Sequence, residues 1–325
     1  GEGMYFDTTK VSDYGKLAHL DVSGLEAGKR VDVSGKRHIT DFAVWKFSPT
    51  DKKRDMEWDS PWGIGFPGWH LECSVIARET LGDRLDIHSG GIDHIPVHHT
   101  NEIAQTESIT CEPFANLWLH NNHIKIDGTK ISKSLGNVIT LQDITDHGYS
   151  MDTFKVMVLS KHFETEGNFT WEILDAASNR LQNWRATAAL RHQLHDTLRP
   201  DSENANIPSG AARQALLERL SDNLDTPGAL ALIDATVSAI ESASPTTINP
   251  DNLEAFFMSV DELLGLRIIT STPDIDDDQK RLIIERNAAR EAKDWATSDK
   301  LRAALSEQNI GLNDTKHGTV WYYQS

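Results

Sequence analysis

The chain has 325 residues, 38% of them hydrophobic and 25% charged, which is typical of a globular protein with two or more domains. It contains no apolar run long enough to cross a bilayer, and two cysteines cannot build a disulfide framework, so we expect a cytoplasmic protein with reduced thiols. The net charge of −17 argues against nonspecific binding of polyanions but still allows a nucleic-acid partner that meets local basic faces.

The first part of the chain combines strand and helix patterns. Residues 1–67 are rich in glycine, lysine and aspartate and contain short strand-like pieces such as 39–46. The elements expected next are a helix over 71–81, a buried strand over 85–88 that runs into Gly90 and Gly91, and a helix over 101–108. This alternation favours an α/β domain with a parallel sheet that binds ligands at its strand ends.

From about residue 170 the pattern changes to amphipathic helices, which predicts a helical bundle. The apolar positions at helical spacing are Leu174, Ala177, Leu181 and Trp184, then Leu216, Leu220 and Leu224, then Leu230, Ile233, Val237 and Ile240, then Leu253, Phe256, Phe257, Val260 and Leu264. Residues 270–278, with Pro273 and an acidic run, are interpreted as a linker. It leads into a terminal module over 279–325 of two short helices and a strand tail.

Residues 130–137 form a loop in which Lys130 and Lys133 bracket Ser132, followed by glycine and asparagine. Two lysines in such a loop suit the stabilisation of charged phosphates as they separate in a transition state. The alternative interpretation is a solvated basic loop, which is the commoner meaning of a short Lys/Ser string alone.

A metal site is indicated by Cys73, His98 and Glu102. His98 and Glu102 stand four residues apart and share one face of a helix, and Cys73 can join them only through tertiary folding. These are ligand types that zinc prefers, and a site with three protein ligands is catalytic or incomplete. The alternative is a buried free cysteine beside a surface histidine–glutamate pair.

Residues 86–93 lie between these ligands and place two glycines and Asp93 after a strand. Glycines there allow close approach of a nucleotide, and a carboxylate can accept hydrogen bonds from a ribose or an amino group. A plain turn is the alternative. Trp69 is interpreted either as a core residue or as a residue facing a ligand.

Together these segments resemble the cysteinyl-tRNA synthetases, a family of class I aminoacyl-tRNA synthetases. The matching pieces are 41–46, 67–74, 86–88 with 90–93, 98–105, the 130–137 loop as a variant of the class's KMSKS signature, and the tail. The resemblance covers essentially the whole chain. It implies an α/β fold, the second half of a class I Rossmann-type nucleotide-binding domain, followed by an α-helical bundle and a small α+β anticodon-binding domain.

The resemblance also implies a division of the chain. The expected parts are a connective remnant over 1–67, the catalytic half over 68–140, a stem-contact region over 141–170, a tRNA-binding helical bundle over 171–268 and an anticodon-binding domain over 279–325.

The activity that the resemblance implies is ATP-dependent activation of L-cysteine to cysteinyl-AMP, with Mg²⁺ accompanying ATP, and transfer of cysteine to tRNA(Cys) by a monomer. Cys73, His98 and Glu102 match three of four Zn²⁺ ligands in the family, where the metal binds the substrate thiolate and thereby selects cysteine. The remaining correspondences are Trp69, His70 and His88 in the cysteine pocket, Asp93 at the nucleotide or amino acid, Lys133 at ATP with Lys130 as its helper, and Arg290, Trp295, Asp299, Arg302 and Asp314 at the anticodon.

The family's N-terminal half, with its HIGH-type histidine signature and the cysteine that is the fourth zinc ligand, has no match in the sequence. We therefore expect a C-terminal portion that is inactive unless complemented. Two alternatives are a noncatalytic tRNA-binding fragment and the related cysteine ligase of mycothiol assembly. The mycothiol enzyme has no need for an anticodon-binding domain, whereas the tail from Arg290 to Trp321 matches one, which disfavours this alternative.

Overall fold

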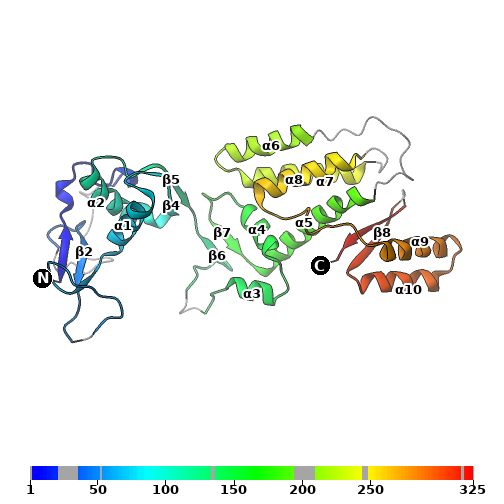
Figure 1. The fold of residues 1–325 in the computed structure, drawn as a ribbon, viewed down its shortest axis with the longest axis horizontal. Coiled ribbons are helices and arrows are strands. Elements are labelled where there is room, and N and C mark those ends of the chain that lie inside the picture. Colours follow the sequence, from blue (N-terminus) through cyan, green and yellow to red (C-terminus); the bar gives the residue numbers. More distant parts are fainter. Residues whose placement is uncertain are drawn as a thin grey trace. The chain divides into compact units, whose positions relative to one another are not determined.

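The computed structural model describes residues 2–20, 36–51, 53–132, 136–193, 209–243, 248–315 and 318–324. The chain divides into two compact units, Gly1–His123 and Ile124–Ser325, and Figure 1 labels most of their helices and strands. Within the described residues, no helix is both long enough and apolar enough to span a membrane. Lys133, which the sequence predicts to contact ATP, lies outside the described residues.

The first unit begins with an antiparallel sheet in the order β1-β2-β3. Its strands are β1 (Gly3–Phe6), β2 (Phe42–Phe47) and β3 (Gly65–Pro67), with short 3-10 turns η1 (Thr8–Lys10) and η2 (Lys16–Ala18) between the first two. The buried Asp41 carboxylate accepts from the backbone amides of Thr8 at 3.1 Å and His38 at 2.9 Å. These bonds fix the entry into β2, which is the strand predicted over 39–46.

The second half of this unit alternates helix and strand, as the sequence predicts. Its elements are α1 (Trp69–Leu81), β4 (Leu85–Gly91), the helical turns η4 (Ile92–His94) and η5 (Ile95–His99), α2 (Thr100–Thr110) and β5 (Ala115–Asn121). Strands β4 and β5 are parallel, so the predicted parallel pairing is confirmed. The elements that carry the predicted metal ligands, α1, η5 and α2, all lie in this half.

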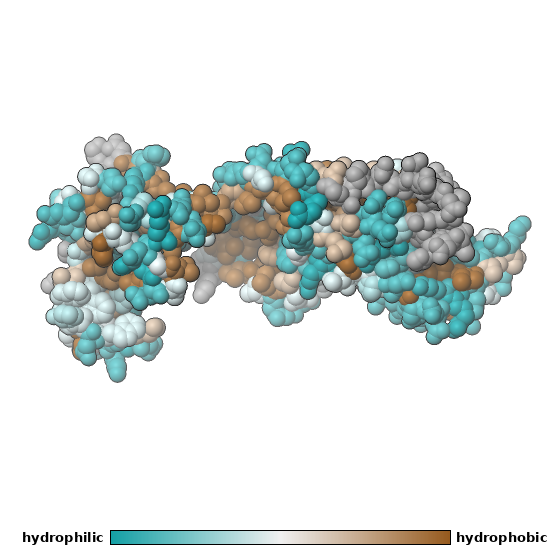
Figure 2. All heavy atoms as spheres, turned by 45° about the horizontal axis from the view of Figure 1, so that its top comes forward, coloured by the Kyte–Doolittle hydropathy of each residue, from teal (hydrophilic) through white to brown (hydrophobic). Residues whose placement is uncertain are grey.

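The predicted burial of residues 85–88 is wrong except at Leu85. Ile87 is 60% exposed, and a small core of Leu85, Phe114 and Ala115 lies at the start of the strand pair. Parallel strands are usually covered on both faces, but among the described residues β4 pairs with β5 alone. Figure 2 shows apolar side chains between hydrophilic ones on the visible surface of this unit.

The second unit is mainly helical, in agreement with the predicted bundle. It contains β6 (Ile124–Ile126), α3 (Leu141–Asp146), α4 (Met151–Leu159), β7 (Gly167–Phe169), α5 (Trp171–Ala189), η7 (Leu190–His192), α6 (Ser209–Ser221), α7 (Thr226–Ser242) and α8 (Pro250–Leu264). The predicted apolar stripe of α5 is buried at Leu174, Ala177, Leu181 and Trp184 and joins one core with α7 and α8. Helical periodicity therefore identified the packed faces of α5, α7 and α8, but the prediction is wrong at Leu224, which lies beyond the end of α6 with a φ of 54° and is 45% exposed.

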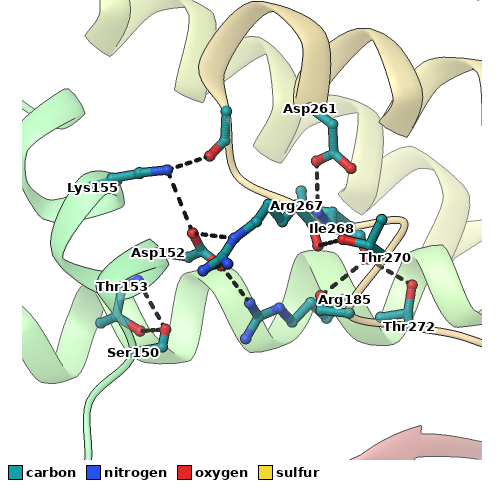
Figure 3. Close-up of polar contacts among 12 residues, drawn as sticks. Ser150, Asp152, Thr153, Lys155, Arg185, Asp261, Arg267, Ile268, Thr270 and Thr272 are labelled. Carbon is teal, nitrogen blue, oxygen red and sulfur yellow. Dashed lines mark hydrogen bonds and ion pairs between the residues drawn. The ribbon is translucent and has the colours of Figure 1, made fainter. Parts of the chain in front are cut away.

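A polar network links α4, α5 and the segment after α8 (Figure 3). The buried Asp152 carboxylate accepts from Arg267 at 3.0 Å and from Arg185 at 3.3 Å, and Lys155 lies 3.7 Å away. Asp261 accepts from the backbone amide of Ile268 at 2.6 Å. Three cations thus surround one buried carboxylate.

The segment predicted to be a linker, 270–278, is partly buried. Thr272 and Ile275 are inside, and Arg191 donates to the Thr272 hydroxyl at 2.9 Å and to its carbonyl at 2.6 Å. The composition of the segment does not predict this burial, because the residue that covers Thr272 is Arg191, about 80 residues away in the sequence. The segment therefore leads from α8 to α9, as a linker should, with Thr272 and Ile275 buried along it.

The terminal module has the predicted two helices and strand tail. These are α9 (Asp277–Glu291) and α10 (Trp295–Ser306), with the antiparallel strands β8 (Ile310–Thr315) and β9 (Gly318–Tyr323). Gly318 begins β9 with a φ of 123°, a conformation that favours glycine. Trp321 is buried in the module's core with Leu305 and Leu312.

Candidate metal and substrate site

The three predicted metal ligands come together between α1 and α2. Cys73 lies in α1, His98 lies in the turn before α2, and Glu102 lies in the first turn of α2. One ligand atom from each residue lies within 4.8 Å of the others, and His98 Nε2 is 3.6 Å from Glu102 Oε1. Tertiary folding therefore brings Cys73 to the face that the histidine and glutamate share.

Glu102 gives the observation that tests whether a metal fits. Its side chain is 0% exposed, and its Oε1 atom is buried without a hydrogen-bond partner in the described part of the chain. A buried carboxylate oxygen without a partner is unfavourable, and a cation would compensate it. Together with a thiol and an imidazole, this oxygen forms a donor set that suits zinc.

Burial sets the protonation of the other two ligands. Burial, with the charges of Glu102 and Glu72, raises the pKa of the Cys73 thiol. Burial lowers the pKa of His98 to about 4, against the opposing charge of Glu102. The imidazole is therefore neutral at pH 7, which is the form that coordinates metals.

Trp69 and His70 open α1 beside these ligands. Trp69 is 56% exposed and stacks on His98 with ring centroids 4.0 Å apart, so its interpretation as a core residue is wrong. The Nδ1 atoms of His70 and His98 are 2.8 Å apart and share a hydrogen bond. Burial lowers the pKa of His70 to about 4. The aromatic wall of the site thus comes from the first turn of α1.

His88 lies in the middle of β4, and Asp93 lies in η4, just after the strand ends. His88 Nε2 is 3.0 Å from Glu102 Oε2, which places His88 at the metal ligands. Asp93 is exposed and lies 3.5 Å from His123. A Cβ on Gly91 would clash with the Asp93 carboxylate, and one on Gly90 would lie 2.7 Å from the His99 ring. The two glycines therefore serve close packing of side chains in the site.

The sequence interpretation missed His99 and His120. His99 is buried, and its Nδ1 lies 2.8 Å from His120 Nε2. His120 is opposite Gly90 in the β4–β5 register. The pair His98-His99 was visible in the sequence, but His120 could be assigned only once the register of the parallel strands was known.

Lys130 is exposed at the start of the signature loop, in the second unit. The Asn137 side chain contacts the start of the loop: its Nδ2 donates to the Lys130 carbonyl at 3.1 Å, and its Oδ1 accepts from the Ser132 amide at 2.9 Å. The role of Asn137 as a loop brace was not predicted. It leaves the Lys130 ammonium exposed.

The predicted anticodon residues cluster in the terminal module. Asp314 accepts from Arg290 at 2.7 Å, and Arg302 donates to the Leu312 carbonyl at 2.8 Å. Asp299 and Arg302 line a cavity of about 340 Å³. Trp295, at the N-terminus of α10, is 56% exposed. The sequence missed Arg286, which donates two hydrogen bonds to Asp314.

A family model described as "tRNA synthetases class I (C) catalytic domain" matches residues 1–179. "Cysteine--tRNA ligase 1" of Burkholderia lata is 42% identical over 98% of this chain and 64% of its own length. "Cysteine--tRNA ligase" of Chlamydia caviae is 36% identical over 97% of this chain and 67% of its own length.

A solved LeuRS–tRNA–LeuAMS complex from Agrobacterium radiobacter K84 aligns with 66% of this chain and 33% of that chain, with 15% identity and a TM-score of 0.48. The chain spans about two thirds of the length of the two cysteine–tRNA ligases named above. The match of the family model over more than half of the chain, together with these identities, shows that the chain belongs to the cysteine–tRNA ligase family of class I aminoacyl-tRNA synthetases.

Proposed function

We propose that this chain belongs to an enzyme that activates L-cysteine with ATP, releases pyrophosphate and transfers cysteine to tRNA(Cys). The observation that carries the proposal is the convergence of Cys73, His98 and Glu102, whose ligand atoms lie within 4.8 Å of one another. We further propose that the protein is a cytoplasmic monomer.

The donor set supports binding of Zn²⁺ by Cys73, His98 and Glu102. When bound, the ion supplies a soft centre that favours a substrate thiolate over the hydroxyl of serine. Glu102 offers its unpartnered Oε1, while its other oxygen is held by His88 at 3.0 Å. His70 orients the His98 ring through their shared hydrogen bond at 2.8 Å.

The substrate cysteine is proposed to lie against Trp69, His70 and His88. Trp69 is exposed and stacks on a ligand histidine, so its free face can cover a small amino acid. Asp93 is exposed and offers a carboxylate to an amino or ribose group. Burial lowers the pKa of His70 and of His98 to about 4, so both imidazoles are neutral at pH 7 and add no positive charge beside the substrate.

ATP, with Mg²⁺, is proposed to be bound by Lys130 and Lys133 of the signature loop. Their ammonium groups offset the negative charge that develops on the leaving pyrophosphate. The Asn137 brace supports this role, because its hydrogen bonds hold the backbone of Lys130 and Ser132 while the Lys130 side chain stays exposed.

The terminal module is proposed to read the anticodon through Arg290, Trp295, Asp299, Arg302 and Asp314. The exposed Trp295 offers a stacking surface for an unpaired base, and Arg302 lines a cavity with Asp299 that can accept a base edge. The bundle over 171–268 and the stem-contact region over 141–170 are proposed to contact the body of the tRNA.

Cysteine-dependent ATP–pyrophosphate exchange tests the proposal, in this chain and in the complete open reading frame that contains it. We expect exchange in the complete protein and none in the chain alone. Cys73→Ser should lower the exchange in the complete protein by about 100-fold or more, because it removes a metal ligand. Cys111→Ser is the matched control, since Cys111 is an exposed cysteine.

Three results would contradict parts of this proposal. Equal exchange by wild type and Cys73→Ser would remove the metal-ligand role of Cys73. Robust exchange by the chain alone would show that the family's missing signature is dispensable. Specific binding of tRNA(Cys) without exchange in the complete protein would favour a noncatalytic tRNA-binding role.

A further inference from the structure

The cavity of about 340 Å³ in the terminal module has an aromatic side chain in its wall. The helix α10 contributes Asp299, Arg302 and Ser306 to the lining, and the strand pair β8–β9 contributes Gly311 and Tyr322. Among the described residues that line the cavity, Tyr322 is the only aromatic one. It has no counterpart among the anticodon residues proposed above, so its presence there needs an explanation of its own.

The Tyr322 ring lies across Gly311 of the neighbouring strand. The two residues are partners in the antiparallel register of β8 and β9. A Cβ on Gly311 would lie 2.6 Å from Cε2 and 2.7 Å from the hydroxyl oxygen of Tyr322, which is too close for any side chain. The absence of a side chain at position 311 therefore lets the ring lie against β8 as part of the cavity wall.

The alternation of β9 separates Tyr322 from the module's core. Successive side chains of a strand point to opposite faces, so Trp321 and Tyr323 share one face and Tyr322 lies on the other. Trp321 and Tyr323 both pack in the core. The Tyr323 hydroxyl also donates to the Pro273 carbonyl at 3.0 Å. Core packing thus explains the two neighbours of Tyr322 but not Tyr322 itself.

The polar groups beside the ring suit the edge of a nucleobase. Arg302 donates to the Leu312 carbonyl at 2.8 Å, which holds its guanidinium at the cavity. The Asp299 carboxylate lines the same cavity and accepts hydrogen bonds. A base presents a flat π-face and an edge that both donates and accepts, so an aromatic ring between a carboxylate and a guanidinium matches it.

A second aromatic side chain precedes the cavity on α10. Trp295, Asp299, Arg302 and Ser306 follow one another at spacings of four, three and four residues, which places them on one face of the helix. Trp295 and Arg302 are seven residues apart, or about 10 Å along the helix axis. One base step of a stacked strand covers only about 3.4 Å. Trp295 and the cavity are therefore spaced for two different bases of one strand.

We propose that Tyr322 is a second base-stacking residue of the terminal module, which takes one unpaired anticodon base into the cavity while Trp295 stacks on another. The inference rests on the anticodon-reading role proposed above for this module. Its test must therefore distinguish a failure of Tyr322 from a failure of that role.

Binding of the tRNA(Cys) anticodon stem-loop to the whole chain, measured by fluorescence anisotropy, tests the ring. Tyr322→Ala should weaken binding by about 5- to 100-fold, the range for loss of one base–aromatic stack. Tyr322→Phe keeps the ring and should recover most of the affinity, whereas Tyr322→Leu keeps bulk without a π-face and should not. Gly311→Ala displaces the ring from β8 and should also weaken binding.

Tyr323→Phe is the matched control, because it changes a tyrosine on the opposite face of β9 and should leave the affinity unchanged. Thermal unfolding checks the fold of each variant. The conservative Phe and Leu variants keep the comparison valid if Tyr322→Ala or Gly311→Ala does not fold.

Three stem-loops, each lacking the base at one anticodon position, identify the base that the ring contacts. Tyr322→Ala should lower the affinity for two of these RNAs and have no effect on the third, which lacks the base that stacks on Tyr322. Trp295→Ala should be without effect on a different one of the three. This pattern would assign each aromatic side chain to its own base.

A wild-type chain that discriminates the tRNA(Cys) anticodon, but whose affinity is unchanged in Tyr322→Ala and Tyr322→Leu, would overturn this inference and leave the proposed function standing. Equal losses of Tyr322→Ala on all three altered RNAs would also overturn it, because the ring would then be a structural support. Equal binding of wild type to cognate and altered anticodons would contradict the anticodon-reading role, and the inference would fall with it.

Discussion

Arg286 and Asp314 form a two-point ion pair inside the terminal module. The guanidinium donates to the two carboxylate oxygens at 2.6 and 2.7 Å, and the Arg286 side chain is only 1% exposed. Arg290 adds a third bond to the same carboxylate at 2.7 Å. Asp314, a predicted anticodon reader, therefore also ties β8 to α9.

Asp314→Asn is expected to destabilise the terminal module by about 3 kcal/mol, because it leaves the buried Arg286 guanidinium without its carboxylate. Hydrogen exchange of the α9 amides measures the loss locally. Asp299→Asn removes the same charge from an exposed position in α10 and should cost less than about 1 kcal/mol. Equal protection of α9 in the wild type and Asp314→Asn would contradict the prediction.

The same pair predicts a dependence on acid. The Arg286 guanidinium holds the pKa of Asp314 well below its usual range, so the pair stabilises the fold above the pKa of an unfolded aspartate. That stabilisation is lost as the pH falls from about 4 toward the folded pKa. The stability difference between wild type and Asp314→Asn should therefore be constant at neutral pH and shrink below about pH 4 in urea denaturation series. A stability difference between wild type and Asp314→Asn that increases below about pH 4 would contradict the predicted direction of the pH dependence.

Asp152→Asn is expected to lower the free energy of unfolding of the second unit by about 3 kcal/mol. The substitution leaves Arg185 and Arg267 with a neutral partner inside the network of Figure 3. Urea denaturation followed by circular dichroism measures the effect. Lys155→Met is the control and should cost less than about 1 kcal/mol, because Lys155 is 48% exposed. Similar midpoints for the two variants would show that the carboxylate does not organise the network.

The Tyr14 hydroxyl should ionise at a higher pH than an ordinary tyrosine. Its hydroxyl donates to Asn101 Oδ1 at 2.6 Å, and burial, with the charge of Asp41, raises its pKa to about 12. The stabilisation from the neutral phenol is present below the ordinary pKa of about 10 and is lost as the pH rises from there toward 12. In a titration of phenolate absorbance, Tyr14→Phe should remove a step near pH 12 that Tyr322→Phe retains. An unchanged late step in Tyr14→Phe would refute the assignment.

Trp295→Ala is expected to weaken binding of the tRNA(Cys) anticodon stem-loop by about 1–3 kcal/mol, because it removes an exposed stacking surface. Trp295→Phe should recover part of the affinity. Filter binding against a stem-loop with an altered anticodon measures whether the loss is specific. Equal losses on both RNAs would indicate a general contact and not an anticodon reader.

The sequence by itself determined the local elements and the family. The periodicity of α1, α2 and the bundle helices follows from which side chains share a helix face, and this holds wherever the helix packs. The spacing of His98 and Glu102 is likewise a local property of one helical segment. The family motifs are ordered strings of residues, so they too can be recognised without coordinates.

Only the tertiary structure decided which distant side chains meet. Cys73 reaches Glu102, His120 reaches His99 and Arg286 reaches Asp314 because packing and strand register bring separate elements together. The exposure of β4 and the burial of Thr272 were decided in the same way, by which neighbours cover each segment. Residue type and spacing along one element leave such contacts open, since they depend on the arrangement of elements far apart in the chain.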